Sequence, residues 1–449
     1  MLQPDTIPQQ EPLLMVGIVL PEDRKDNIEV HIPTEPLFIL MNEVGETIDL
    51  QPGDLVRVFA REGSLWASIN ENERTCGTIF YIKPAVRKYP IYTRSGIRVK
   101  DVVSGRDFHW RKFIDVYLPG ALEFRIHDDR IILINEVPME YYLMCVATSE
   151  MGASCPDALI ESQTIVARSW MLANVEMKHR KLGMDVCNDD CCQRYQGTTF
   201  LTSHSIQGAR STTGKVLIFN DRICDARYSK SCGGVAEDYR HVWDKTEVPY
   251  LQSRPDFPAG YTHRALPLNS EEQVSLWVNS IPKAFCGPYF IRDEELGHYL
   301  GSVDEEGEYF RWTFMYTQNE MKALLNLKLD LNAEKILAII PMARGCSGRL
   351  TKVKIEYLKR RNLRAEHIID DQYNIRAAFH ELFLYSSAFV VETEPGPNDI
   401  PKTFTLKGAG WGHGVGYCQI GALGMALAGY TTEDIVRHYY PGANLVTIY

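Results

Sequence analysis

INEVPMEYYLMCVATSEMGASCPDALIESQTIVARSW, residues 134–170, passes from a strand pattern through a turn into a helix pattern. From Pro156 onward, apolar residues recur every three or four positions, as they do along a helix that buries one face. Because proline suits the first helical turn and glycine suits the residue after the last one, we expect a helix of about 25 residues from Pro156 to Lys181, ended by Gly183. Glu150 stands at the junction of strand and helix.

Short alternating runs separated by turns lie on both sides of this segment and predict β-strands. The runs before it are Leu13–Leu20, Leu55–Phe59, Thr78–Ile82 and Arg130–Ile134. The runs after it are Lys215–Phe219, Cys224–Tyr228, Leu350–Ile355 and Ala388–Glu392. The part of the chain before the segment is therefore β-rich, and strands return near its end.

Helix signals punctuate the second half of the chain. Ser270 with Gln273 and Thr317 with Glu320 have the spacing of capping boxes, so residues 252–344 form a mixed or helical elaboration. A helical stretch is expected at Ile375–Leu384, and a glycine-dense loop at Gly408–Gly416. Two final helices are expected, one over Gln419–Ala428 before Gly429 and one capped at Thr431 or Thr432 and ended by Pro441-Gly442.

Composition excludes several classes of protein. The 449 residues carry 48 basic and 58 acidic side chains, a net charge of -10, which disfavours binding to nucleic acid. No apolar run approaches the roughly eighteen residues of a membrane span. Leu13–Leu20 lacks a preceding Lys or Arg, so we interpret it as a first strand and not as a signal peptide.

Three of the eleven cysteines, Cys187, Cys191 and Cys192, fall within six residues. Near neighbours in sequence rarely reach disulfide geometry with one another, so this spacing favours metal binding. Buried apolar thiols are the alternative. Glu150 also has two interpretations. It is either a solvated glutamate where a helix begins, or a carboxylate whose proton affinity is tuned by burial and nearby dipoles for catalysis.

The same segment resembles the SpoIID (stage II sporulation protein D) family, also called the SpoIID/LytB or amidase-enhancer family. The matching residues are Asn135, Glu136, Pro138, Glu140, Tyr142, Leu143, Ser149, Glu150, Met151, Pro156, Ala158, Leu159, Gln163, Ala167 and Arg168. The resemblance continues in DARYSKSCGGVAEDYRHVW at 225–243, and it is most specific in the tail GAGWGHGVGYCQIGALGMALAGYTTEDIVRHYYPGANL. It covers about residues 115–449, interrupted near 252–344.

The resemblance implies a lytic transglycosylase that cleaves the glycan strands of bacterial peptidoglycan, with Glu150 as its single general acid and base. Such an enzyme closes a 1,6-anhydro ring on muramic acid and activates no water, so one carboxylate suffices where hydrolases use two. Other carboxylates could intrude on the site, namely Asp157, Glu161, Glu237 and Asp238.

The family also implies a structural zinc ion with ligands His179, Cys187, Cys191 and Cys192, of which His179 departs from the family spacing. Four protein ligands leave no open position for a water. Further family segments imply substrate-binding residues, which are Tyr228, Ser231, Cys232, Gly233, Gly234, Trp243, His413 and Gln419. The alternatives are a tight turn with buried aromatic rings for the first segment and a structural role for His413.

By resemblance the fold is α+β, a mixed β core with the long helix packed on it. We expect a β-rich N-terminal part (1–113), a catalytic core with the cysteine cluster (114–251), the inserted elaboration (252–344) and a C-terminal part with the Gly-His-Gly loop (345–449). In this fold Glu150 is expected to lie in a groove near Tyr228–Gly234 and Gly412–Gln419.

Two other functions remain open. The first is a non-catalytic glycan-binding enhancer of an N-acetylmuramoyl-L-alanine amidase, which would be indifferent to Glu150→Gln. The second is a zinc hydrolase, which would need an open metal position that the closed ligand set does not offer. The substrate implies an extracytoplasmic location, in the periplasm or cell wall, while a cytoplasmic homologue acting on recycled wall fragments is the alternative.

Overall fold

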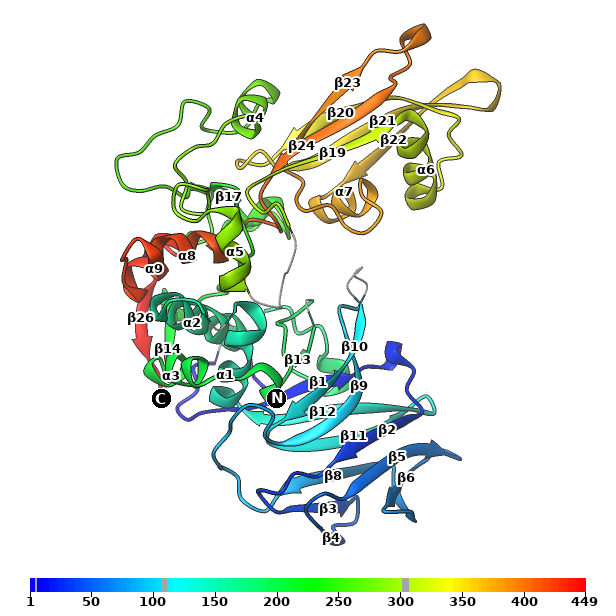
Figure 1. Ribbon diagram of the computed structural model, residues 1–449, viewed down its shortest axis with the longest axis vertical. Coiled ribbons are helices and arrows are strands. Elements are labelled where there is room, and N and C mark those ends of the chain that lie inside the picture. The colour runs from blue at the N-terminus through cyan, green and yellow to red at the C-terminus, as the bar shows by residue number, and fades with distance from the viewer. Residues whose placement is uncertain (5, 107–110, 153, 174, 190, 301–306) are drawn as a thin grey trace. The chain divides into compact units, whose positions relative to one another are not determined.

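The computed structural model describes residues 1–449 apart from 5, 107–110, 153, 174, 190 and 301–306 (Figure 1). The chain divides into two compact units. The first contains Met1–Asp225, Leu300–Val303 and Asn444–Tyr449, and the second contains Ala226–Tyr299 and Asp304–Ala443. The described residues form strands in several sheets together with helices, so the predicted α+β class is confirmed.

Two sheets form the β core of the first unit, and one hydrophobic core contains residues from both. The seven-stranded sheet has the order β13 (Val186–Cys187), β1 (Leu13–Val19), β12 (Arg130–Pro138), β11 (Ala121–His127), β8 (Ile79–Pro84), β3 (Phe38–Asn42) and β4 (Thr47–Leu50). The six-stranded sheet has the order β10 (Lys112–Leu118), β9 (Ile97–Ser104), β2 (Asn27–His31), β5 (Leu55–Arg61), β6 (Ser64–Ile69) and β7 (Asn72–Gly77).

Three helices complete the first unit and pack together: α1 (Met139–Glu150), α2 (Asp157–Ala173) and α3 (Ser203–Ser211). Helix α2 also packs on a small sheet of β15 (Arg222–Ile223), β14 (Lys215–Phe219) and β26 (Asn444–Thr447). Strand β26 follows the whole second unit in the chain, so the first unit is built from distant parts of the sequence.

The second unit has its own core, built from two three-stranded sheets with α6 and α7. The sheets are β19 (Arg311–Thr317), β24 (Thr403–Ala409) and β23 (Phe389–Glu394), and β20 (Lys335–Arg344), β21 (Leu350–Lys359) and β22 (Leu363–Asp370). The strand pairs are β16 (Tyr228–Ser229) with β25 (Tyr417–Cys418) and β17 (Val235–Ala236) with β18 (Arg254–Pro255). The remaining helices are α4 (Glu271–Val278), α5 (Asp293–Leu300), α6 (Gln318–Leu329), α7 (Gln372–Ala378), α8 (Gln419–Leu427) and α9 (Thr432–Tyr439).

The predicted start of the long helix is confirmed, but its predicted length is wrong. Helix α2 ends at Ala173, and Gly183 instead ends a short 3₁₀ helix, Arg180–Leu182. The apolar stripe stops because Val175, which seemed to continue it, is 51% exposed.

The prediction of a turn around Glu150 is also wrong. Strand β12 passes directly into a separate helix, α1, of which Glu150 is the last residue.

Two shorter predictions also need correction. Cys224–Tyr228 is not one strand, because β15 ends at Ile223 and β16 begins at Tyr228 in a different sheet. The helix expected at Ile375–Leu384 lies earlier, at Gln372–Ala378. Its N-cap is Asp371, whose side chain accepts a hydrogen bond from Asn374 N at 2.8 Å.

Candidate functional site

Glu150 occupies a defined position at the end of a buried helix. Nearly all of α1 is inaccessible to solvent, whereas the Glu150 side chain is only half-buried. Its Oε1 accepts a hydrogen bond from the backbone N–H of Arg194 at 3.1 Å. The carboxylate is therefore held at the surface of the first unit by a loop that is 44 residues away in sequence.

That loop is itself fixed by buried side chains. Gln193 accepts a hydrogen bond from Tyr142 OH in α1 at 3.0 Å and donates one to the Ala167 carbonyl in α2 at 3.2 Å. Tyr195 stacks on Tyr142 with 4.8 Å between ring centroids, and its hydroxyl donates to Asn135 Oδ1 at 2.8 Å. Because satisfied buried networks are rigid, the residues on either side of Arg194 hold its N–H towards Glu150.

The four predicted metal ligands come together immediately before this loop. The ligand atoms of His179, Cys187, Cys191 and Cys192 all lie within 4.8 Å of one another. Cys191 Sγ lies 3.1 Å from Cys187 Sγ and 3.8 Å from His179 Nε2. Three thiols and one imidazole are a ligand set that suits tetrahedral zinc, so the residues present fit such an ion.

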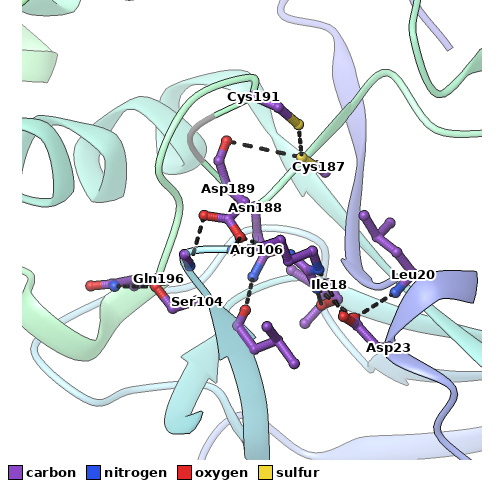
Figure 2. A network of polar contacts seen from close by, with 12 residues as sticks. Ile18, Leu20, Asp23, Ser104, Arg106, Cys187, Asn188, Asp189, Cys191 and Gln196 are labelled. Atoms are coloured by element: carbon purple, nitrogen blue, oxygen red, sulfur yellow. Dashed lines mark hydrogen bonds and ion pairs between the residues drawn. The ribbon is translucent and has the colours of Figure 1, made fainter. Parts of the chain in front are cut away.

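A largely buried arginine side chain, that of Arg106, holds the loop that carries the cysteines (Figure 2). Arg106 pairs with Asp23 at 2.6 Å and with Asp189 at 3.3 Å, and it donates to Asn188 Oδ1 at 2.7 Å. Asp189 also accepts the backbone N–H groups of Gly105 and Arg106 at 2.9 and 2.7 Å. Residues 188 and 189 are thus tied to β9 and to the turn after β1, while Cys187 pairs with Gly17 in β1.

In the second unit, the two family segments predicted to bind substrate lie side by side. Tyr228 pairs with Tyr417 in the parallel strands β16 and β25, and Ser231 N and O both hydrogen-bond to Trp411, at 3.0 and 2.8 Å. A Cβ at Gly233 would lie 2.8 Å from the backbone N of Gly410, which explains why glycine is required there.

The predicted substrate-binding residues differ in exposure. Tyr228, Trp243 and His413 are half-buried, and the Trp243 and His413 rings meet edge to face with centroids 4.9 Å apart. The others are buried, and they are Ser231, Cys232, Gly233, Gly234 and Gln419. The glycan-binding prediction therefore depends on the three partly exposed rings.

The His413 ring is neutral at neutral pH. Val415 N donates to its Nδ1 at 3.0 Å, which places the ring proton on Nε2. Burial lowers the pKa of His413 to about 3, and the nearby positive charges of Arg227, Arg349 and Arg376 add to this shift. A neutral imidazole of this tautomer can donate one hydrogen bond, from Nε2, but it carries no positive charge.

The carboxylates that could intrude on the site are engaged elsewhere. Asp157 pairs with His204, and Glu161 accepts a hydrogen bond from Ser211 Oγ at 2.7 Å. Glu237 is buried and belongs to the second unit, where it accepts a hydrogen bond from Ser347 Oγ at 2.6 Å. Burial raises the pKa of Glu237, but its hydrogen bonds with His241 and Ser347 hold it below the ordinary value.

Several supporting residues were not predicted from the sequence. The positioning of Glu150 by Arg194 N, and of that loop by Gln193 and Tyr195, could not be foreseen. The only signal was the nearness of this loop to the cysteine cluster. Glu150 and the residues predicted to contact substrate belong to different units, so their predicted common groove stays a prediction.

Comparison with known proteins gives matches along most of the chain. Residues 127–219 match the family model described as Stage II sporulation protein, and residues 237–416 match a domain of unknown function, DUF8618. Stage II sporulation protein D of Bacillus subtilis is 24% identical over 327 residues, 70% of this chain and 75% of that protein. An uncharacterized protein of Brachyspira hyodysenteriae is 22% identical over 327 residues, 73% of this chain and 72% of that protein.

The amidase enhancer of Bacillus subtilis is 25% identical over 309 residues, which is 67% of this chain but only 40% of the enhancer.

The fold and the site define an α+β protein that presents a glutamate at the end of a buried helix. A cysteine-bearing loop holds this glutamate in place. Residues 127–219, which contain both features, match the SpoIID family model, and the resemblance of the chain to the SpoIID/LytB family is confirmed. None of the helices in the described part of the chain could span a lipid bilayer.

Proposed function

We propose that the chain is a peptidoglycan lytic transglycosylase with Glu150 as its general acid and base. One observation carries the proposal. Glu150 is half-buried at the end of α1, and its carboxylate is oriented by Arg194 N at 3.1 Å. A partly exposed carboxyl group oriented in this way can meet a bound glycan.

The chemistry needs only this carboxyl group. Protonated Glu150 donates its proton to the glycosidic oxygen as the bond from that oxygen to the anomeric carbon of N-acetylmuramic acid breaks. The resulting carboxylate then takes the proton of the C6 hydroxyl of the same sugar, and O6 bonds to the anomeric carbon. Glu150 ends protonated again, the glycan chain is cut, and no water is consumed.

Product analysis tests this function. Incubation of the purified chain with intact glycan strands, and separately with strands stripped of stem peptides, should release fragments that end in 1,6-anhydro-N-acetylmuramic acid. Mass spectrometry distinguishes them because each is lighter by one water than the corresponding hydrolysis product. Fragments with reducing ends would overturn the transglycosylase and indicate a hydrolase.

The amidase-enhancer relative favours a second candidate, a glycan-binding protein that stimulates an N-acetylmuramoyl-L-alanine amidase without cutting glycan. The partly exposed Tyr228 ring could stack on sugars in either function, whereas the Trp243 ring already stacks on Tyr239 and has the Arg227 guanidinium over it. If strands are bound but no fragments appear, and if added chain accelerates a cell-wall amidase to the same degree with Glu150→Gln, the second candidate replaces the first.

We also propose that His179, Cys187, Cys191 and Cys192 hold a structural zinc ion. All four ligands are protein groups, so the ion would shape the loop and would not activate water. The loop continues directly to Arg194, so its order bears on the hydrogen bond to Glu150.

If peptidoglycan is the substrate, the chain acts outside the cytoplasm, in the periplasm or cell wall. Its partners would be glycan strands and cell-wall amidases.

Cys191→Ala should lose one zinc ion per chain, because it removes the ligand whose sulfur lies close to both Cys187 Sγ and His179 Nε2. Inductively coupled plasma mass spectrometry of the reduced, purified variant measures this loss. Cys76→Ala is the matched control, since Cys76 is a buried thiol in the same unit but lies outside the cluster. Equal zinc content in the unchanged chain and in Cys191→Ala would contradict the ligand assignment.

A further inference from the structure

A second cluster of potential ligands lies in the other unit. The ligand atoms of Cys232, Asp256, Cys286 and Cys418 lie within 4.8 Å of one another, and all four residues are buried. They come from four separate segments: the loop after β16, the residue after β18, the loop between α4 and α5, and the end of β25. The cluster shares no residue with the one around Cys187.

Two distances within the cluster are close to the edges of a zinc tetrahedron. Bonds of about 2.3 Å to sulfur and about 2.0 Å to oxygen place two sulfurs about 3.8 Å apart, and a sulfur and an oxygen about 3.5 Å apart. Cys232 Sγ lies 3.7 Å from Cys286 Sγ and 3.3 Å from Asp256 Oδ2. A disulfide requires about 2.05 Å between sulfurs, and all three thiols are free.

The Asp256 carboxylate is oriented as a metal ligand, with one oxygen towards the cluster. Its Oδ1 hydrogen-bonds to His438 Nε2 at 3.1 Å and accepts from Tyr439 OH at 2.9 Å. Its other oxygen, Oδ2, faces Cys232 Sγ. Ligating carboxylates in metal sites are commonly held in place by such outer hydrogen bonds.

Backbone N–H groups point at two of the sulfurs. Cys418 Sγ accepts from Cys232 N at 3.1 Å and from Gly421 N at 3.3 Å, and Cys232 Sγ accepts from Gly234 N at 3.3 Å. Hydrogen bonds to a charged acceptor are stronger than those to a neutral one, so these donors favour thiolates. A Cβ at Gly421 would lie 2.5 Å from Asp256 Oδ2 and 3.1 Å from Cys418 Sγ, so a larger residue would crowd the ligands.

The surroundings balance the charge of an occupied site. Three thiolates and one carboxylate around a divalent zinc ion leave two net negative charges. Two arginines carry the opposite charge nearby: the partly buried Arg311, which interacts electrostatically with Cys286 and Cys232, and the buried Arg349, which interacts with Glu237 and with all three cysteines. Burying an ion is costly unless it is paired, and this arrangement provides the pairing.

We propose that Cys232, Asp256, Cys286 and Cys418 bind a second structural zinc ion. With four protein ligands and no exposed ligand residue, the site is closed and serves architecture and not catalysis. It fastens the segment that contains Cys286, within the 252–344 elaboration, to the two segments that carry Tyr228 and His413. This inference does not rest on the proposed transglycosylase function.

The test begins by removing the other candidate site. His179→Ala/Cys191→Ala, purified as the full chain under reducing conditions without chelator, should retain one zinc ion per chain by inductively coupled plasma mass spectrometry. Replacing that zinc with Co²⁺ should give the visible and near-ultraviolet absorption of tetrahedral cobalt with thiolate ligands. Absence of both signals in this folded background overturns the proposal, even if no further variant folds.

Further substitutions in that background locate the ion. Cys286→Ala should lower zinc from one ion per chain to none, and Gly421→Ala should reduce occupancy through crowding. Cys346→Ala is the comparison. This cysteine lies in the same unit outside the cluster, but it forms another group of potential ligands with Glu237 and His241, so retained zinc in this variant also excludes that group as the site. Loss of zinc in Cys346→Ala but not in Cys286→Ala, or a disulfide between two of the three cluster cysteines in the mass spectrum of the unreduced protein, would overturn the assignment.

Discussion

Glu150→Gln should release anhydro-ended fragments about a thousandfold more slowly than the unchanged chain, because the amide neither donates nor accepts the proton that the reaction needs. The amide oxygen can still accept the hydrogen bond from Arg194 N, so the loop should keep its place. Fragment release over time, measured by mass spectrometry at saturating substrate, gives the ratio of rates.

The matched control is Glu161→Gln. Glu161 is also a half-buried glutamate of the first unit, and it accepts a hydrogen bond from Ser211 Oγ. This variant should cut glycan at an unchanged rate. If Glu150→Gln is as active as the unchanged chain, Glu150 is not the acid. If both variants lose activity and unfold at lower temperature, the loss reflects stability and not chemistry.

Arg168→Ala should lower the free energy of unfolding by about 3–5 kcal/mol, because it leaves a buried carboxylate without its partner. Arg168 is fully buried and donates to both oxygens of Glu140, at 2.9 and 2.7 Å. It also donates to the Lys215 carbonyl at 3.0 Å, and Glu140 accepts from Tyr449 OH at 2.7 Å. The pair thus joins α1, α2, β14 and residue 449. Urea unfolding followed by circular dichroism measures the change.

Two comparisons separate the ion pair from other causes. Arg57→Ala breaks an exposed pair with Glu29, in which the Arg57 side chain is 58% exposed, and it should cost less than about 1 kcal/mol. Glu140→Met/Arg168→Met removes both charges and should recover much of the stability lost in Arg168→Ala. A double variant as unstable as Arg168→Ala would show that lost packing, and not the unpaired charge, dominates.

Local sequence signals predicted much of the fold. Strand β14 occupies the predicted Lys215–Phe219, and the capping boxes at Ser270 and Thr317 begin α4 and α6 as expected. Helix α1 was missed for a physical reason. It is buried nearly all round, so its residues show no polar face, and an apolar run of this kind cannot be told from a buried strand by periodicity.

Only part of the candidate site could likewise be predicted from the sequence. The cysteine cluster was foreseeable because Cys187, Cys191 and Cys192 are close in sequence and the resemblance supplied His179. The cluster of Cys232, Asp256, Cys286 and Cys418 spans nearly two hundred residues and has no local spacing signal, so only the fold reveals it. The same holds for Arg194 N, since a backbone donor leaves no trace in side-chain chemistry.

The pairing of β14 with β26 bears on the order of assembly. Lys215 aligns with Thr447, so the small sheet beneath α2 cannot close until the residues of the second unit have been synthesised. Contacts between such distant parts of a chain form slowly because a long loop must first be closed. Nearly all of the second unit is one stretch of chain that precedes β26, so this unit can fold while β26 is still being synthesised. Until that strand is made, the helices that carry Glu150 and Arg168 lack one of their supports.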